Sequence, residues 1–324
     1  MPRPKSPPDH YLLGKVSALY YLRDQTQQAI AERLDLSRPT VSRLLREARE
    51  LGYVQITVTS PRGLHLELET RLEDACGLHS VRVVDWDAGQ DVAMLRRQLG
   101  AAAAQYLART ITTGETIGMA WGTTLSAMVD AMVPMPTTDT RVVQILGGLG
   151  PPDAAENGGQ LVRGLAQLLD AQAVLLPAPG VVATPAVRDV LSNDPHVRAA
   201  LNELDSLDTV FVGLGSLASN AVLNDGHSFS KQARKELRAG HAVGDIALRF
   251  FNAQGRAVQT ALDDRILGIT TDQLQKVRRV VAVAGGGDKT EAIAAGLKTA
   301  LVHTLITDRA TAEALLARSS WCPV

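Results

Sequence analysis

The sequence predicts an α/β protein with two domains, a small helix-turn-helix domain followed by a larger domain with a mostly parallel sheet. Two observations predict this class. Residues 1–63 carry ten Lys and Arg against six Asp and Glu, whereas the rest of the 324-residue chain carries 23 against 28. From Ser80 onward, short apolar runs alternate with segments of helical periodicity, as in sheets covered by helices on both faces. We therefore expect one domain over residues 1–59 and a second over residues 60–324.

Three helices are expected in the N-terminal domain. Apolar residues recur at three- and four-residue spacing over 10–24, and a second helix fits 26–34. After the break at LDLS, Ser37 can cap a third helix that Gly52 ends. The alternating run YVQITVT, residues 53–59, is expected to form a strand of a wing.

The third helix of this domain has two distinct faces. Its inward stripe consists of Val41, Leu44, Leu45 and Ala48. Its outward residues are Arg38, Thr40, Ser42, Arg43 and Arg46. Short polar and basic side chains at the start of such a helix suit the major groove of DNA, so we expect these five residues to contact double-stranded DNA. The alternative is a winged helix used for protein contacts, whose arginines form a solvated face.

The larger domain is expected to begin with a helix over residues 63–78, in which Leu64, Leu68 and Leu72 are spaced in fours. Further helices are expected over 92–109, 123–133, 158–170, the stretch up to about 204, 288–298 and 309–317. The expected strands are 80–85, 116–120, 141–146, 173–176, 208–213, 246–251, 278–284 and 301–307. In such sheets, ligands bind where the strands end.

Two glycine-bearing turns follow the second and third of these strands. In AWGTTLSAM, Gly122 allows a close turn, and Thr123 and Thr124 open a helix whose free N–H groups could bind an anion. The alternative is a plain threonine cap. In LGGLG, Gly147 and Gly148 either line the same cleft or only turn the chain.

A third turn, AGGGDKTE, combines Gly285 and Gly286 with a lysine. Walker A requires glycine directly before the lysine, and Asp288 stands there, so the nucleotide-loop pattern fails. Asp288 and Glu291 have the spacing of a capping pair, which would place Lys289 at the first helical position. A cation there opposes the helix dipole by about 0.3–1 kcal/mol, so an anion at the loop would explain it. The alternative is a solvated lysine.

Other polar residues stand near strand ends. Asp245, Asp263, Asp264 and Arg265 could complete a site, because carboxylates accept hydrogen bonds from sugar hydroxyls. As isolated residues, they fit surface or capping roles equally well. The pattern VFVGLGSLA resembles a dinucleotide-binding turn, but the stretch after it is not a convincing helix.

The composition limits the classes of function. Hydrophobic residues make up 45% of the chain and the formal net charge is −1, but the basic N-terminal segment is typical of nucleic-acid binding. Cys76 and Cys322 have no metal-ligand spacing, and we expect neither a metal nor a cofactor. No signal peptide is apparent and no apolar run approaches ~18 residues, so we expect a cytoplasmic protein without a membrane partner.

Taken together, these motifs resemble the SorC family of bacterial transcriptional regulators over essentially the whole chain. The helix-turn-helix stretch AERLDLSRPTVSRLLREARELG is shared with many regulators. More specific is the ordered set GETIGMAWGTTL, RVVQILGG, VLLPAP, VFVGLGS, GDIALRFFNAQG, LDDRILGIT and VVAVAGGGDKTEAIAAGLKTALVHTLITD.

The resemblance implies a Rossmann-like effector domain related to sugar-phosphate isomerases and deaminases, homodimers or homotetramers, and palindromic operators near carbohydrate genes. It implies that the 122–124 turn and Lys289 contact a phosphate, and that Asp245 stands at an acidic position reached by sugar hydroxyls. That position is commonly Glu, so the shorter Asp departs from the pattern. Leu146 and Gly147 stand where some relatives have an arginine, which favours a ligand with one phosphate or none.

The sequence thus predicts a DNA-binding regulator of carbohydrate genes, controlled by a sugar or sugar phosphate and without enzymatic activity. The expected effector-binding residues are Gly122, Thr123, Thr124, Gly147, Gly148, Asp245, Gly285, Gly286 and Lys289. The main alternative is an active sugar-phosphate isomerase or deaminase fused to a DNA-binding domain. No histidine stands in a recognisable catalytic setting, but Asp245, Asp263 or Asp264 could serve as its general base. A nicotinamide-sensing regulator would rest on GLGS alone.

Overall fold

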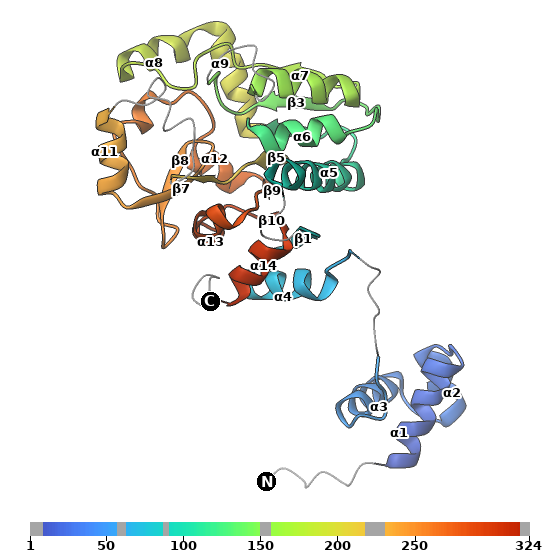
Figure 1. Cartoon of the computed structure of the whole chain (residues 1–324). Coiled ribbons are helices and arrows are strands. Elements are labelled where there is room, and N and C mark those ends of the chain that lie inside the picture. Colours follow the sequence, from blue (N-terminus) through green and yellow to red (C-terminus); the bar gives the residue numbers. More distant parts are fainter. Residues whose placement is uncertain (1–8, 57–62, 87–90, 150–156, 218–230, 318–324) are drawn as a thin grey trace, which may run out of the picture. The chain divides into compact units, whose positions relative to one another are not determined.

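The chain forms two compact units, Met1–Ser60 and Pro61–Val324. The computed structural model describes residues 9–56, 63–86, 91–149, 157–217 and 231–317, and Figure 1 shows the elements of each unit. The α/β class predicted from the sequence, with a helix-turn-helix region before a larger domain, is confirmed.

The smaller unit is helical within the described residues. Its elements are α1 (His10–Ser17), which continues into the π-helical turn η1 (Ala18–Leu22), α2 (Gln27–Leu34) and α3 (Arg38–Glu50). The predicted cap is confirmed, since the Ser37 hydroxyl accepts a hydrogen bond from the Thr40 N–H at 3.3 Å. The inward stripe of α3 is also confirmed, because all four of its predicted residues are buried against α1 and α2.

The predicted wing strand does not begin where it was expected. Tyr53–Ile56 follow α3 without strand structure, and 57–59 lie outside the described residues. Tyr53 instead turns back onto the start of α1, where its hydroxyl contacts the imidazole of His10. Alternation alone predicted a strand here, but the described part of this run has no ladder partner.

The larger unit is built on a seven-stranded parallel sheet. The strand order is β1-β10-β9-β5-β2-β3-β4. The strands are β1 (Ser80–Val84), β2 (Thr116–Met119), β3 (Arg141–Gln144), β4 (Gln172–Val174), β5 (Thr209–Val212), β9 (Arg279–Val283) and β10 (Thr304–Asp308). The order reverses between β2 and β5. Strands β3 and β4 follow on one side of β2, whereas β5, β9 and β10 lie on its other side. In open sheets of this kind, ligands bind at such a switch point.

Helices cover both faces of this sheet (Figure 1). One layer contains α5 (Val92–Thr110), α6 (Thr123–Ala131) and α7 (Gly158–Leu169), and the other contains α4 (Leu66–Cys76), α13 (Thr290–Lys298) and α14 (Arg309–Ala317). The remaining helices are α8 (Pro185–Asn193), α9 (Pro195–Asn202), η2 (Glu203–Ser206), α11 (Lys231–Ala239), η3 (Asp263–Arg265), α12 (Thr271–Lys276) and η4 (Gly287–Lys289). No helix among the described residues is both long and apolar enough to cross a membrane.

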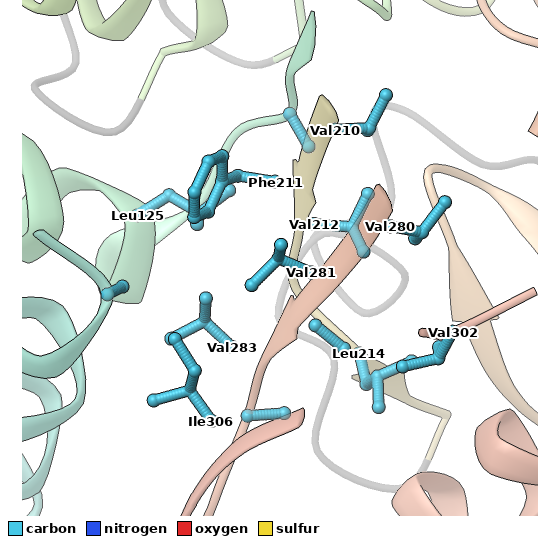
Figure 2. Close-up of a cluster of buried hydrophobic side chains, with 14 of the residues drawn as sticks. Leu125, Val210, Phe211, Val212, Leu214, Val280, Val281, Val283, Val302 and Ile306 are labelled. Carbon is cyan, nitrogen blue, oxygen red and sulfur yellow. The ribbon is translucent and has the colours of Figure 1, made fainter. Parts of the chain in front are cut away.

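The central strands are apolar on both faces, as a doubly covered sheet requires. Figure 2 shows Phe211, Val281 and Val283 pointing towards Leu125 of α6, while the neighbouring strand residues point to the opposite face. All of these side chains are buried. The continuous apolar runs read from the sequence therefore fill two layers of core at once.

The predicted strand 246–251 is in fact part of a hairpin. A three-stranded sheet contains β6 (Gly215–Ser216), β7 (Ala242–Ile246) and β8 (Arg249–Asn252), with β7 antiparallel to both neighbours. The chain reverses at Ala247 and Leu248, both with positive φ, and the Leu248 N–H donates to Oδ2 of Asp245 at 3.0 Å. Apolar side chains on the turn hid it from the sequence pattern.

Candidate functional site

The predicted ligand loops share one edge of the seven-stranded sheet. The turns after β2, β3, β5 and β9 all lie at the carboxyl edge, because these strands are parallel, and β5 lies between β2 and β9. The turns after β2 and β5 flank the switch point. The structure therefore brings the 122–124 turn and the loop at 285–289 to the same edge.

The 122–124 turn begins α6 without a side-chain cap. Gly122 is the N-cap residue with φ of 124°, a conformation that L side chains rarely adopt, and no side-chain hydrogen bond caps the helix. The plain threonine cap considered from the sequence is therefore wrong. Thr123 is exposed and Thr124 is half-buried, so the first N–H groups of α6 and two hydroxyls stand together at the carboxyl edge.

The glycines after β3 contact two other loops. Gly147 is buried and its N–H donates to Leu267 O at 2.9 Å, while the Gly148 N–H donates to Ala178 O at 2.9 Å. Gln144, which sequence reasoning missed, braces this region: its Nε2 donates to Leu146 O, and its Oε1 accepts from the Leu176 N–H. These contacts favour a structural role for Gly147 over a direct ligand contact.

The loop after β9 is held in place by a buried carboxylate that sequence reasoning also missed. Asp308, at the end of β10, has no exposed surface and accepts hydrogen bonds from the Gly286 N–H at 2.7 Å and from the Thr311 N–H and hydroxyl. A Cβ atom on Gly285 would lie 2.3 Å from Oδ2 of Asp308, so glycine is required there. The D-x-x-T spacing of a helix cap at Asp308 was the available signal.

The predicted capping pair in this loop is wrong. The chain makes a 3-10 turn over Gly287–Lys289 without a side-chain cap, and Lys289 is itself the N-cap residue of α13. The Thr290 hydroxyl donates to Gly287 O, which closes the turn. Asp308 already anchors the loop from the other side, so the local cap predicted at Asp288 does not form. Lys289 nevertheless stands at the start of a helix, as expected.

Lys289 is the unusual cation of the site. Its side chain is partly buried, and within the described residues its ammonium has neither a hydrogen bond nor an ion pair. Burial lowers the pKa of Lys289; Asp288 and Asp245 act in the opposite direction, and Arg96 lowers the pKa further by repulsion. These influences come from α5, β7 and the loop itself, so the fold gathers distant segments around this ammonium.

The other predicted polar residues are occupied by local structure. Asp245 is 5% exposed and lies in β7, where it pairs with Gly215 in β6, just beyond β5. Asp263 accepts from the Thr260 N–H and pairs with Arg249 at 3.5 Å, and Arg265 donates to Ala183 O at 3.4 Å. Asp264 is exposed. Of these polar residues, Asp245 is the one that acts on Lys289, together with Asp288 of the loop itself.

The predicted DNA-contacting residues lie mainly on the open face of α3. Arg38, Ser42, Arg43 and Arg46 are exposed. Thr40 is half-buried and its hydroxyl contacts that of Ser37 at 2.8 Å, so this side chain already serves the helix cap. Arg43 pairs with Glu47 one turn later at 3.3 Å, a surface pair of about 0.3–0.5 kcal/mol. The pairing leaves the arginine accessible.

Comparisons with known proteins agree with this geometry. Residues 61–317 match the family described as "Putative sugar-binding domain", and residues 16–63 match the MarR family. The chain is 31% identical to the sorbitol operon regulator of Klebsiella pneumoniae over 95% of its own length and 98% of the relative's. This chain belongs to the SorC family of transcriptional regulators.

Other similarities place the chain in the same family. The deoxyribonucleoside regulator of Bacillus subtilis is 32% identical, with 93% of this chain and 96% of the relative covered. The crystal structure of full-length SorC from Klebsiella pneumoniae superimposes with a TM-score of 0.75 and 30% identity, covering 96% of this chain and 100% of that one. This SorC-family chain is thus a transcriptional regulator with a helix-turn-helix region and a sugar-binding domain, and the relatives named here are regulators.

Proposed function

We propose that this protein regulates carbohydrate metabolism genes by binding double-stranded operator DNA through α3, and that a sugar or phosphorylated sugar bound at the carboxyl edge of the larger unit controls it. We further propose that it works in the cytoplasm as a homodimer or homotetramer and catalyses no reaction. The effector-binding residues proposed are Gly122, Thr123, Thr124, Gly148, Asp245, Gly285, Gly286 and Lys289, with Gly147 shaping the loop behind them.

One observation carries the effector half of this proposal. The ammonium of Lys289 is desolvated and has no hydrogen bond or ion pair with the described residues, and it lies at the same edge of the sheet as the first N–H groups of α6 and two threonine hydroxyls. A partly buried unpaired charge costs free energy unless something neutralises it. A phosphate oxygen would accept hydrogen bonds from all three kinds of donor, and Asp245 stands nearby for a hydroxyl group.

Control of DNA binding then requires a difference between two states. An effector that binds one quaternary arrangement more tightly shifts the population towards it, and this changes whether two α3 helices match the half-site spacing on DNA. An effector with equal affinity for both arrangements would change nothing.

The effector site is tested by thermal unfolding in the presence of a panel of sugars and sugar phosphates. We expect the best phosphorylated compound to stabilise the wild-type protein and to lose most of this effect with Lys289→Ala. Lys276→Ala, an exposed lysine at the end of α12, is the matched control. Equal stabilisation of the wild type and Lys289→Ala would remove this lysine from the site, and turnover of any compound of the panel would contradict the non-enzymatic proposal.

The DNA half is tested with fragments selected by the wild-type protein from random sequences. Arg46→Ala and Arg43→Ala should each weaken the free energy of DNA binding by about 1–3 kcal/mol if the arginine reads a base. If the arginine contacts a phosphate, the slope of log affinity against log salt concentration should become shallower by about one unit. Lys15→Ala, exposed on α1, should leave both quantities unchanged. If both arginine variants behave like Lys15→Ala, α3 is not the recognition helix.

A further inference from the structure

Helix α5 begins beside the effector site, although no sequence motif pointed to it. A Cβ atom added to Gly286 would lie 3.5 Å from Leu95 Cδ2, and one added to Gly285 would lie 3.2 Å from Leu99 Cδ1. The first turns of α5 therefore pack on the loop after β9. The helix ends at the opposite edge of the sheet, where Thr110 O accepts from Arg279 at 3.0 Å. It therefore runs from the carboxyl edge to the amino edge.

Helix α6 runs in the same direction and packs tightly on α5. It starts at Thr123, directly after β2, and a Cβ atom on Gly100 of α5 would lie 2.4 Å from the backbone of Ala127. One turn earlier on both helices, the residues at the same level are Arg96 on α5 and Thr123 on α6. This level is that of the 122–124 turn.

The direction of Arg96 follows from helix geometry. At about 100° per residue, Arg96 projects between Leu99, about 60° away, and Gly100, about 40° away. Leu99 faces the glycine loop and Gly100 faces α6, so Arg96 projects into the angle between these two elements. Side chains on a helix also tilt towards its N-terminus, which here is the carboxyl edge of the sheet. Arg97 projects about 160° away from Leu99 and faces solvent.

Two cations lie at this place, and the carboxylates of Asp288 and Asp245 also act on Lys289. Arg96 is exposed and, like Lys289, has no hydrogen bond or ion pair of its side chain with any other described residue. Repulsion from Arg96 is felt at Lys289, although the two residues come from different layers of the fold. Two cations without an ion pair, at the sheet edge where the uncapped start of α6 also lies, can complement a dianion even with Asp288 and Asp245 close to Lys289.

We propose that Arg96 is a second cationic effector-binding residue, which together with Lys289 holds the phosphate of a phosphomonoester between α5, the 122–124 turn and the glycine loop. This inference rests on the proposed effector site and specifies its ligand: a phosphorylated compound is selected over its neutral counterpart. Through the ligand, the arginine contact also links α5 to the loop after β9. Effector binding therefore involves the helical layer that contains α5, α6 and α7.

The test uses inorganic phosphate as the probe, titrated into the full chain at constant ionic strength. Binding is followed by the fluorescence of Trp121, which directly precedes Gly122, and by thermal unfolding. We expect Arg96→Gln to raise the dissociation constant about tenfold to a hundredfold, as the loss of a charge-assisted hydrogen bond does, and Arg96→Lys to retain part of the affinity. Arg97→Gln is the matched control and should stay within about twofold of the wild type.

The outcomes separate this inference from the proposed function. If Lys289→Gln weakens phosphate binding while Arg96→Gln behaves like Arg97→Gln, the role of Arg96 is overturned and the effector site stands. If neither variant weakens binding, both proposals fail. If phosphate does not bind to the wild-type protein, the phosphomonoester assignment is overturned, and the screen of neutral sugars then decides on the site itself. Because Arg96 is exposed, unliganded Arg96→Gln should unfold at the wild-type temperature or slightly above it.

Discussion

At the amino edge of the seven-stranded sheet, Arg279 lies in a complete network of partners. Its guanidinium contacts Glu115, donates to the Thr209 hydroxyl at 2.9 Å and donates to Thr110 O at 3.0 Å. Burial raises the pKa of Glu115, but the hydrogen bonds from Thr209, Thr112 and Arg279 outweigh this and hold it below its ordinary value. At the carboxyl edge, by contrast, Lys289 is desolvated and has no hydrogen bond or ion pair with the described residues.

The cations at the two edges have different roles: Arg279 stabilises the fold, whereas Lys289 is available for a ligand. Arg279 and Glu115 form a buried ion pair, and removing either partner would leave the other charge buried and uncompensated. Because the contacts of Arg279 join β9 to β5 and to the start of β2, this network supports the pairing of the three strands. An unpaired cation at the other edge weakens the fold slightly, and such strain is typical of binding sites. The comparison predicts opposite signs for substitutions at the two edges.

The largest effect is expected from Arg279→Ala. It leaves the carboxylate of Glu115, which is 2% exposed, buried without its cation, which should cost about 3–5 kcal/mol of unfolding free energy. Denaturant unfolding followed by tryptophan fluorescence reports the larger unit alone, because all three tryptophans lie beyond residue 60. The neighbouring Arg278 is exposed, and Arg278→Ala should change stability by less than about 0.5 kcal/mol. Similar losses in both variants would refute the role of the network.

A smaller effect is expected from Asp308→Ala, which links the carboxyl edge to the core. The change removes the carboxylate that accepts from the Gly286 N–H and from Thr311, so that the Gly286 N–H keeps only the Thr311 hydroxyl as acceptor. It should cost about 1–3 kcal/mol of unfolding free energy and weaken phosphate binding. Asp264→Ala removes an exposed carboxylate and serves as the control. If Asp308→Ala lowers stability but leaves phosphate affinity intact, the loop keeps its shape without this anchor.

The periodic parts of this fold could be predicted from sequence. Runs such as RVVAV and SVRVV are apolar, short and bounded by turns, and β9 and β1 form where they stand. The hairpin after β7 could not be predicted, because its turn residues Ala247 and Leu248 are apolar and continue the apolar run, although both have positive φ.

The candidate site shows the same division. Its glycine turns and Lys289 are local motifs, and sequence could point to them. Asp308 and Gln144 act through contacts with residues 22 and 32 positions away, which only the sheet brings together. Arg96 lies in a helix whose periodicity gives no sign of a site, and its direction becomes apparent only when α5 is seen to pack against both the loop and α6.

The smallest and most diagnostic effect is expected from Lys289→Met without ligand. Because burial lowers the pKa of Lys289 in the folded protein, the charged form is destabilised at neutral pH, and a neutral side chain should raise stability by about 0.5 kcal/mol or less. The unfolded chain keeps the ordinary pKa of about 10.4, so wild-type stability relative to Lys289→Met should improve as pH rises from the lowered folded pKa towards that value. Lys276→Met, exposed on α12, should show no such trend.

Phosphate should reverse the order of the two proteins. A bound dianion compensates the charge of Lys289, so at saturating phosphate the wild-type protein should unfold at a higher temperature than Lys289→Met. Urea or thermal unfolding of both proteins at several pH values, with and without phosphate, measures the stability difference between the wild type and Lys289→Met in each condition. If unliganded Lys289→Met is less stable than the wild type at neutral pH, the lysine contributes to the fold as Arg279 does, and the contrast between the two edges of the sheet would have to be abandoned.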